Sequence, residues 1–221
     1  MATKNTHSVS EYSIFEERLN VLSHVIGLLL AVLGSVLLLI RAVSIGEVVH
    51  IVSFGVYGAS MIILYAASSL YHSAKNPIAR RHLKVFDHAA IYILIAGSYT
   101  PFTLVVLSGW VGWTLFGIVW GMAACGVVLK IFFTGRYHKV STAIYVLMGW
   151  LIVLAIKPLS EGLPEAGVQW LVAGGISYTV GALLYSIRRL PLNHALFHVF
   201  VVLGTVFQFI TVYEYILIMP R

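Results

Sequence analysis

The sequence predicts an all-α membrane protein, built as a bundle of seven transmembrane helices. Of its 221 residues, 60% are hydrophobic and only 10% are charged, and the mean hydropathy is +0.94. An ordinary soluble domain carries far more charge on its surface. The apolar runs are continuous rather than alternating, which favours spanning helices over the strands of a barrel.

Seven apolar stretches are long enough, at about 17 to 25 residues each, to cross a bilayer as helices. In chain order we expect them at residues 21–43, 48–71, 86–107, 110–133, 140–156, 167–187 and 193–219. The chain then divides into an N-terminal tail, residues 1–19, and a single transmembrane domain, residues 20–221. The tail carries mixed charge and no small-residue cleavage site follows the first stretch, so this stretch is interpreted as a retained helix rather than a signal peptide.

The connections between the stretches are short, the longest being residues 73–85 and 157–166. They leave no room for a soluble domain, so the chemistry must lie within the bundle. The sequence shows no convincing internal repeat, and a transporter built from inverted repeats therefore finds no support.

Basic residues predict the orientation, because Lys and Arg in short loops are retained on the cytoplasmic side. The N-terminal tail and the second, fourth and sixth connections share one side, with eleven basic residues against three on the other. The eleven are Lys4, Arg18, Lys75, Arg80, Arg81, Lys84, Lys130, Arg136, Lys139, Arg188 and Arg189; the three are Arg41, Lys157 and Arg221. We expect a multi-pass protein of the bacterial plasma membrane with a cytoplasmic N-terminus and an extracytoplasmic C-terminus. Anionic lipid explains the net charge of +6, and nucleic acid is not an expected partner.

Three of the predicted helices bring polar side chains to one depth near the cytoplasmic side. The last stretch begins with His194 and His198, whose spacing places both on one helix face. The second ends at His72, with Ser68 one turn deeper, and Asp87 is expected in the first turn of the third helix. Polar groups in lipid are costly and need partners, so their convergence predicts a metal site.

Zinc suits three neutral imidazoles with a fourth position left to water, which is typical of catalytic sites. We expect His72, His194 and His198 to be the ligands. Asp87 has two possible roles, direct ligand or general base for an attacking water, and the second is preferred. Ser68 would orient the water or Asp87. Taken singly, these residues also have ordinary explanations: interfacial histidines, and a carboxylate that complements a helix dipole.

These same residues resemble the signature of the progestin and adipoQ receptor family, which includes the adiponectin receptors. Within it, the chain is similar over nearly its full length to the bacterial hemolysin III type. Besides Ser68, His72, Asp87, His194 and His198, the resemblance rests on Glu17, Asn20, Ser23, His24, Gly27, Ser69, Tyr71, Phe86, His88, the segment 91–101 and Asn193. It implies seven helices, a cytoplasmic N-terminus, and an intramembrane zinc held by the three histidines, with Asp87 and Ser68 beside it. The wider superfamily also includes alkaline ceramidases, which hydrolyse a lipid amide.

The leading function is therefore a zinc-dependent hydrolase that cuts a lipid amide or ester at the inner leaflet, with membrane lipids as its partners. The alternatives are a receptor or membrane-state sensor with structural zinc, and a hemolysin-like cytolysin. A transporter needs ionisable groups along its path, and the rest of the bundle offers little beyond Gln208, Glu214 and His50. A pore needs amphipathic stripes, whereas these helices are apolar nearly all round.

Other polar residues receive weaker expectations. Asn20 and His24 are expected to begin the first helix, where they either line the same cavity or, as is favoured for His24, form a hydrogen bond with a neighbouring helix. His7, His50, His82 and His138 are expected to be solvated. The run Gly97–Pro101 is expected to bend the third helix, because proline removes a backbone hydrogen bond.

Overall fold

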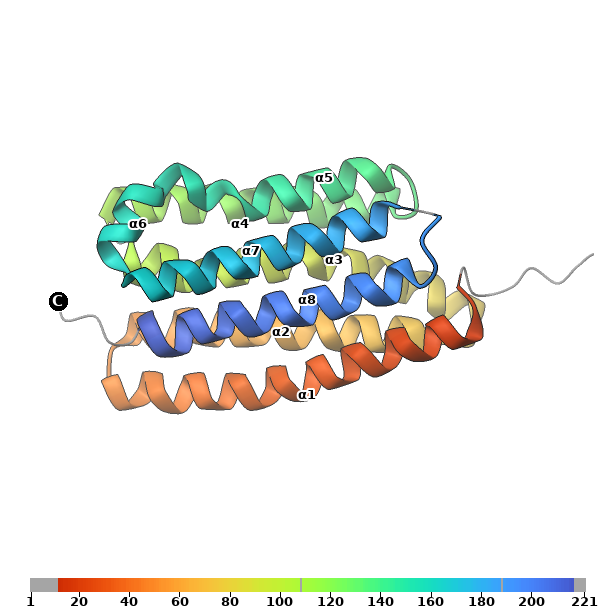
Figure 1. Ribbon diagram of the computed structural model, residues 1–221, viewed down its shortest axis with the longest axis horizontal. Coiled ribbons are helices and arrows are strands. Elements are labelled where there is room, and N and C mark those ends of the chain that lie inside the picture. Colours follow the sequence, from red (N-terminus) through yellow and green to blue (C-terminus); the bar gives the residue numbers. More distant parts are fainter. Residues whose placement is uncertain (1–11, 108, 188, 217–221) are drawn as a thin grey trace, which may run out of the picture.

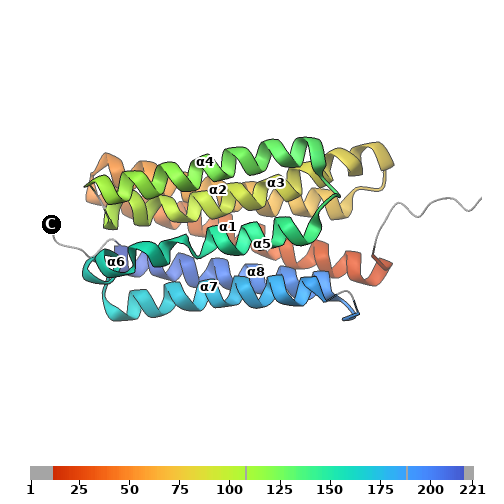
Figure 2. The same ribbon diagram turned by 90° about the horizontal axis from the view of Figure 1, so that it is seen from above.

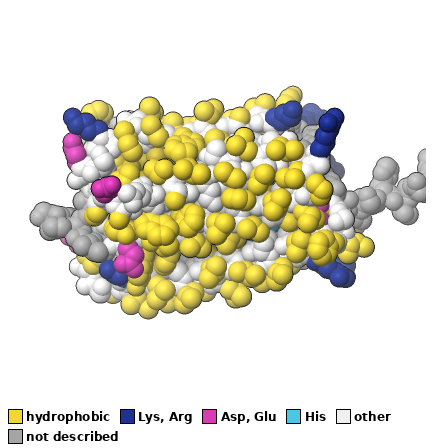
Figure 3. Space-filling model, in the orientation of Figure 1, with side chains coloured by type: hydrophobic (Ala, Val, Ile, Leu, Met, Phe, Trp, Pro, Cys, Tyr) yellow, Lys and Arg dark blue, Asp and Glu magenta, His cyan; other side chains and the backbone are white. Residues whose placement is uncertain are grey.

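The computed structural model describes residues 12–107, 109–187 and 189–216. Its helices run side by side along one long axis (Figures 1 and 2). Seven helical segments of the described chain are long and apolar enough to cross a membrane, which confirms the predicted class. Apolar side chains cover the visible surface between the two ends, and basic side chains gather at the ends (Figure 3).

The seven spans are built from eight α-helices and three short segments of other helical types. They are α1 (Ile14–Ile45), α2 (Val48–Ser73), α3 (Pro77–Pro101) continued by π-helix η1 (Phe102–Val106), α4 (Gly109–Phe133), α5 (His138–Gly149) continued by 3₁₀-helix η2 (Leu151–Ala155) and α6 (Ile156–Gly162), α7 (Glu165–Ser186), and α8 (Asn193–Ile210) continued by π-helix η3 (Thr211–Ile216).

The start of α1 and the α2–α3, α4–α5 and α7–α8 connections lie at one end of the bundle, on the right in Figure 1. We call this the proximal end and the opposite one the distal end. Four residues with a predicted position lie outside the described residues. They are Lys4, His7, Arg188 and Arg221.

Two helices begin well before the start that the hydropathy predicts, by seven residues for the first and nine for the third. Helix α1 starts at Ile14, so residues 14–19 belong to it rather than to the tail. Ser13 caps this start, its Oγ accepting a hydrogen bond from the backbone N–H of Glu16 at 3.1 Å, at the spacing of a capping box. Helix α3 starts at Pro77, so residues 77–85, expected as a connection, are helical. Hydropathy misses both starts because charged residues, Glu16, Glu17 and Arg18 in α1 and Arg80 and Arg81 in α3, separate them from the apolar runs.

The early start of α3 changes the position of Asp87. Asn76 caps the helix, its Oδ1 accepting from the N–H groups of Ile78 and Ala79 at 2.9 and 3.2 Å. Asp87 therefore lies in the third turn, and the expectation that it lies in the first turn is wrong. The helix dipole acts mainly within the first turn, so it does not explain a carboxylate at this position.

The fifth span is broken rather than continuous. Helix α5 ends at Gly149, and α6 continues to Gly162 through residues that were expected to form a connection. The Tyr99 hydroxyl donates to the carbonyls of Met148 and Gly149 at 2.9 and 2.8 Å, and the N–H of Ile152 donates to it at 2.9 Å. A side chain of α3 thus satisfies backbone groups at the break.

The third span widens at its proline. Pro101 has no N–H to continue the α-helical pattern, and residues 102–106 form the π-helix η1. Thr100 and Thr103 donate to the carbonyls of Ala96 and Tyr99, at 2.9 and 3.0 Å. The local irregularity therefore falls at the proline that the sequence marks.

Candidate metal centre

Three histidines meet at the proximal end of the bundle. His72 lies in the last turn of α2, and His194 and His198 lie in the first two turns of α8. All three are buried, and one ring nitrogen of each lies within 4.8 Å of the other two. The structure thus brings together the three residues that the sequence predicts as metal ligands.

The spacing of two of these nitrogens suits a tetrahedral ion. The Nε2 atoms of His72 and His194 lie 3.1 Å apart. Two ligands on a tetrahedral zinc, with Zn–N bonds of about 2.0 to 2.1 Å, stand about 3.3 to 3.4 Å from each other. This pair can therefore accept such an ion with a shift of a few tenths of an ångström, and a ring nitrogen of His198 completes the group within 4.8 Å.

The outward nitrogens of two of the rings are held by groups on α1. His72 Nδ1 lies 2.6 Å from Glu17 Oε2, and His198 Nδ1 lies 3.2 Å from the backbone oxygen of Asn20. Both partners accept hydrogen bonds, so each Nδ1 carries the proton and each Nε2 is left as a lone pair. Metal-ligating histidines are commonly oriented in this way, by a carboxylate or a backbone carbonyl behind the ring.

Glu17 is itself held by a buried arginine. Its Oε1 pairs with Arg80 Nη2, and the Arg80 Nη1 donates to the carbonyls of Tyr71 and Ala74 at 3.4 and 3.2 Å. The guanidinium also lies over the Tyr71 ring, 4.7 Å from its centroid. Sequence reasoning counted Arg80 as a loop charge and Glu17 as part of the tail. The Ser13–Glu16 capping-box spacing was the available signal that the helix starts before Glu17.

Ser68 and Asp87 are both buried, and they relate to the cluster in different ways. Ser68 is one turn before His72, it is fully buried, and its Oγ makes no hydrogen bond within the described residues. Asp87 is also buried, but its carboxylate is not part of the three-histidine group, and it lines a cavity together with His194 and His198. The catalytic roles assigned to both residues stay predictions.

His24 occupies a different position from the favoured expectation. Its ring stacks on that of His198, with centroids 3.5 Å apart and planes 9° apart, and neither of its nitrogens makes a hydrogen bond within the described residues. It lines the cavity, which is the other expectation. Asn20 supports the cluster through its backbone oxygen, which accepts from His198 Nδ1 at 3.2 Å.

The prediction of solvent exposure is tested for two of the four histidines to which it applies. His50 is buried, with Nδ1 3.5 Å from a carboxylate oxygen of Glu47, so that expectation is wrong for His50. His82 is exposed, as expected. His7 and the side chain of His138 lie outside the part of the chain that the structure describes.

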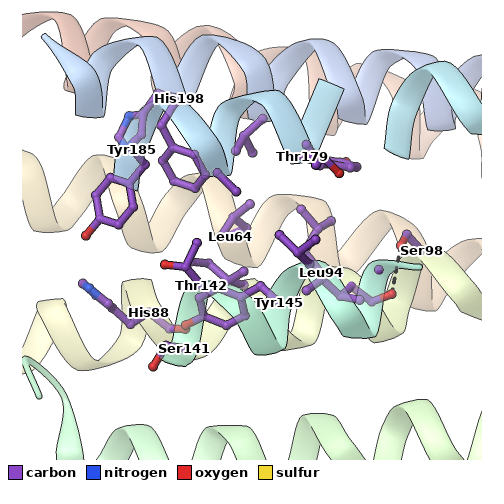
Figure 4. A pocket seen from close by; sticks show the side chains of 18 of the residues that line it. Leu64, His88, Leu94, Ser98, Ser141, Thr142, Tyr145, Thr179, Tyr185 and His198 are labelled. Atoms are coloured by element: carbon purple, nitrogen blue, oxygen red, sulfur yellow. Dashed lines mark hydrogen bonds between the residues drawn. The ribbon is translucent and has the colours of Figure 1, made fainter. Parts of the chain in front are cut away.

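A long cavity extends from the histidine cluster along the bundle, between α3, α5, α7 and α8 (Figure 4). His88, Tyr185 and His198 lie towards one end of it, and Ser98 and Thr179 towards the other. Its walls are largely apolar between these ends, with Leu64, Ile91, Leu94, Ile95, Val146 and Val201 among the lining residues. His198 and Gln208 both line it, and ten residues of helix span about 15 Å. The cavity is therefore long enough for much of an acyl chain.

Comparison with known proteins places these features in a family context. The family described as Haemolysin-III related matches residues 12–209. The chain is similar to Hemolysin-3 of Bacillus cereus, with 46% identity covering 91% of this chain and 92% of the relative. It is also similar to the Hemolysin-3 homolog of Bacillus subtilis, with 44% identity covering 95% and 98%. A more distant relative is the human monocyte to macrophage differentiation factor, with 24% identity covering 91% and 85%.

Proposed function

The chain belongs to the haemolysin-III related family, and we propose that it is an intramembrane zinc-dependent hydrolase that cuts an amide or ester bond in a membrane lipid. One observation carries this proposal: three buried imidazoles converge at the polar end of a long apolar cavity. Three protein ligands leave a position open for water, which is typical of catalytic rather than structural zinc sites.

The donor set supports zinc as the resident metal. His72, His194 and His198 offer nitrogen only, and calcium or magnesium would require oxygen ligands. When bound, zinc would polarise the lipid carbonyl and lower the pKa of a water molecule.

The protein groups around the cluster supply the remaining chemistry. Asp87 accepts a proton from the attacking water and returns it to the nitrogen or oxygen of the leaving group, so that the lipid yields a fatty acid and an amine or alcohol. The hydroxyl of Ser68, which makes no hydrogen bond within the described residues, orients the water or the Asp87 carboxylate. Glu17 and Asn20 hold the imidazoles, and the apolar cavity takes the acyl chain.

The distribution of charge supports a site at the inner leaflet. Exposed basic residues of the proximal end include Lys75, Arg81, Arg136, Lys139 and Arg189, whereas the described distal end offers Arg41, in α1, and Lys157, in α6. Basic loops are retained in the cytoplasm, so we place the proximal end and the N-terminus there. The histidine cluster then lies at the depth of the cytoplasmic lipid head groups.

A hydrolysis assay tests the proposal. Zinc-loaded protein in mixed micelles is incubated with a panel of acyl amides and esters, and released fatty acid is measured by mass spectrometry. We expect product from the wild type, none from Asp87→Asn with its zinc retained, and neither product nor zinc with His198→Ala. Absence of product from every lipid, in a wild type that holds one zinc per chain, would refute the hydrolase and favour a sensor with structural zinc.

A further inference from the structure

A second polar feature of the cavity is the buried ammonium group of Lys130. This residue lies in the last turn of α4 and is only 3% exposed. Its Nζ donates to Ser141 Oγ at 2.7 Å and lies 5.7 Å from the centroid of the Tyr145 ring. Lys130, Ser141 and Tyr145 all line the cavity that leads from the histidine cluster. The amine therefore points inward from α4, towards Ser141 and Tyr145 of α5.

The position of Lys130 in the last turn of α4 does not by itself explain why its side chain is buried. A lysine in the last turn of a membrane helix complements the helix dipole equally well when its amine reaches out to the head groups. The neighbouring Leu129 and Ile131 are exposed on the apolar outer surface. The Lys130 ammonium thus lies inside the bundle, although the end of α4 is close to the lipid head groups and to water.

The two buried cations of the proximal end differ in their partners. Arg80 is paired with Glu17 and also donates to two backbone carbonyls. Lys130 has one neutral hydroxyl partner, and no carboxylate of the described residues lies within 4.0 Å of its ammonium. An ammonium group has three N–H donors, and within the described chain only Ser141 accepts from one of them. A buried charge of this kind is costly without a counter-charge.

The space that a counter-ion would occupy is the cavity itself. Asp87 and His88 line the cavity with Lys130 and Ser141, so the ammonium lies in the same polar region as the predicted general base. Thr142, which follows Ser141, also lines it. A ligand with its acyl chain along the apolar walls would bring its polar group to this region.

We propose that Lys130, with Ser141, binds a carboxylate or phosphate on the polar part of an acyl lipid whose chain lies in the cavity. The identification of this lipid as the substrate rests on the proposed function, whereas its binding does not. The substrate class is thereby narrowed from any amide or ester lipid to an anionic one, with the scissile bond at the histidine cluster and the anionic group at Lys130.

Binding measured without turnover tests this site. Metal-free protein in detergent is titrated with N-oleoylglycine and N-oleoylethanolamine, which share chain and amide but differ in carboxylate against hydroxyl. Oleoyl lysophosphatidate and monooleoylglycerol form a second pair, with phosphate against hydroxyl. We expect each anionic lipid to bind at least about tenfold more tightly than its neutral partner, because a hydrogen bond to a charged group contributes about 1.5 to 3 kcal/mol. Acetate and inorganic phosphate at the same concentrations should not displace the lipids.

Variants test whether Lys130 causes the preference for anionic over neutral lipids. Lys130→Gln should reduce it to within about twofold, Lys130→Arg should keep most of it, and Lys139→Gln, which removes an exposed charge nearby, should leave it unchanged. Equal affinities within both pairs in the wild type would overturn the proposal even if Lys130→Gln does not fold. An unchanged preference in folded Lys130→Gln, or displacement by the free anions, would also overturn it. Because no zinc and no hydrolysis are involved, these outcomes are independent of whether the protein is an enzyme.

Discussion

The helices that carry the histidines and the span that closes the cavity are built differently. In the most apolar part of each span, 50% of the residues of α2 and 44% of those of α8 are buried, against 11% for Lys139–Gly162, which contains α5 and α6. Helix α1 adds Glu17 and Asn20 behind the rings, whereas the fifth span is interrupted at Gly149. Metal ligands need fixed positions, and lightly packed segments open at low cost. We call α1, α2 and α8 the metal half, and the span formed by α5 and α6 the α5 wall. We therefore expect the metal half to be rigid and the α5 wall to be adaptable.

Metal removal should give the largest difference between the two halves. Zinc at about a thousandfold above its dissociation constant stabilises the folded protein by about 4 kcal/mol, and a chelator should remove that stabilisation. Thermal unfolding in detergent, with and without chelator, measures it. His198→Ala should show no response to chelator, because one ligand is missing. An identical response in this variant would place the metal elsewhere.

The second largest effect is expected from a substitution that disturbs the close packing of α1 on α2. A Cβ at Gly27 would lie 2.6 Å from Cε1 of Tyr65, whose hydroxyl is fixed by a 2.7 Å hydrogen bond to Thr205 Oγ1. Gly27→Ala should therefore cost about 1 to 3 kcal/mol of stability. Gly117→Ala is the matched control, since nothing lies within 4 Å of a Cβ there and alanine favours the helix. Equal unfolding temperatures for the two variants would argue against a rigid metal half.

Removing the charge of Glu17 should weaken the metal site without removing a ligand. Glu17→Gln loses the carboxylate behind His72 and the pairing with Arg80, and loss of such a supporting group lowers metal affinity by about 10- to 100-fold. Competition with a fluorescent zinc chelator measures the change. Glu161→Gln, at an exposed position of α6, should bind zinc like the wild type. Wild-type affinity in Glu17→Gln would mean that the contact with His72 has no part in metal binding.

The smallest effect is expected in the α5 wall. The Tyr145 hydroxyl donates to the backbone oxygen of His88 at 2.9 Å, linking α5 to α3. Tyr145→Phe should cost about 0.5 to 1.5 kcal/mol of stability and leave the zinc content unchanged. Unfolding in detergent and metal analysis of the same sample check both parts. A loss of zinc in this variant would show that the two halves are not independent.

The sequence predicted the seven-helix class and the convergence of the three histidines well, because both depend on local signals. Long apolar runs identify the spans, and the spacing of His194 and His198 places both on one helix face. Helix starts were predicted less well, since charged residues separate the first turns, at Ile14 and Pro77, from the apolar runs. The position of Asp87 within α3 was wrong for this reason.

Contacts between distant segments could not be predicted from the pattern. Glu17 meets His72 and Arg80, which lie 55 and 63 residues further along the chain. The inward turn of Lys130 depends on Ser141 and Tyr145, two side chains of another helix. The break after Gly149 is likewise supported by Tyr99, a residue of another helix. Such groups are recognised only when the helices have been placed against one another.

Metal content tests the three-histidine site most directly. Elemental mass spectrometry is applied to the detergent-purified wild type beside His194→Ala/His198→Ala and Asp87→Ala, each checked for folding. We predict about one zinc per chain in the wild type, none in the double histidine variant, and nearly full zinc in Asp87→Ala. A folded wild type that holds no zinc after resupply of the metal would contradict the site and leave the histidines a structural role alone.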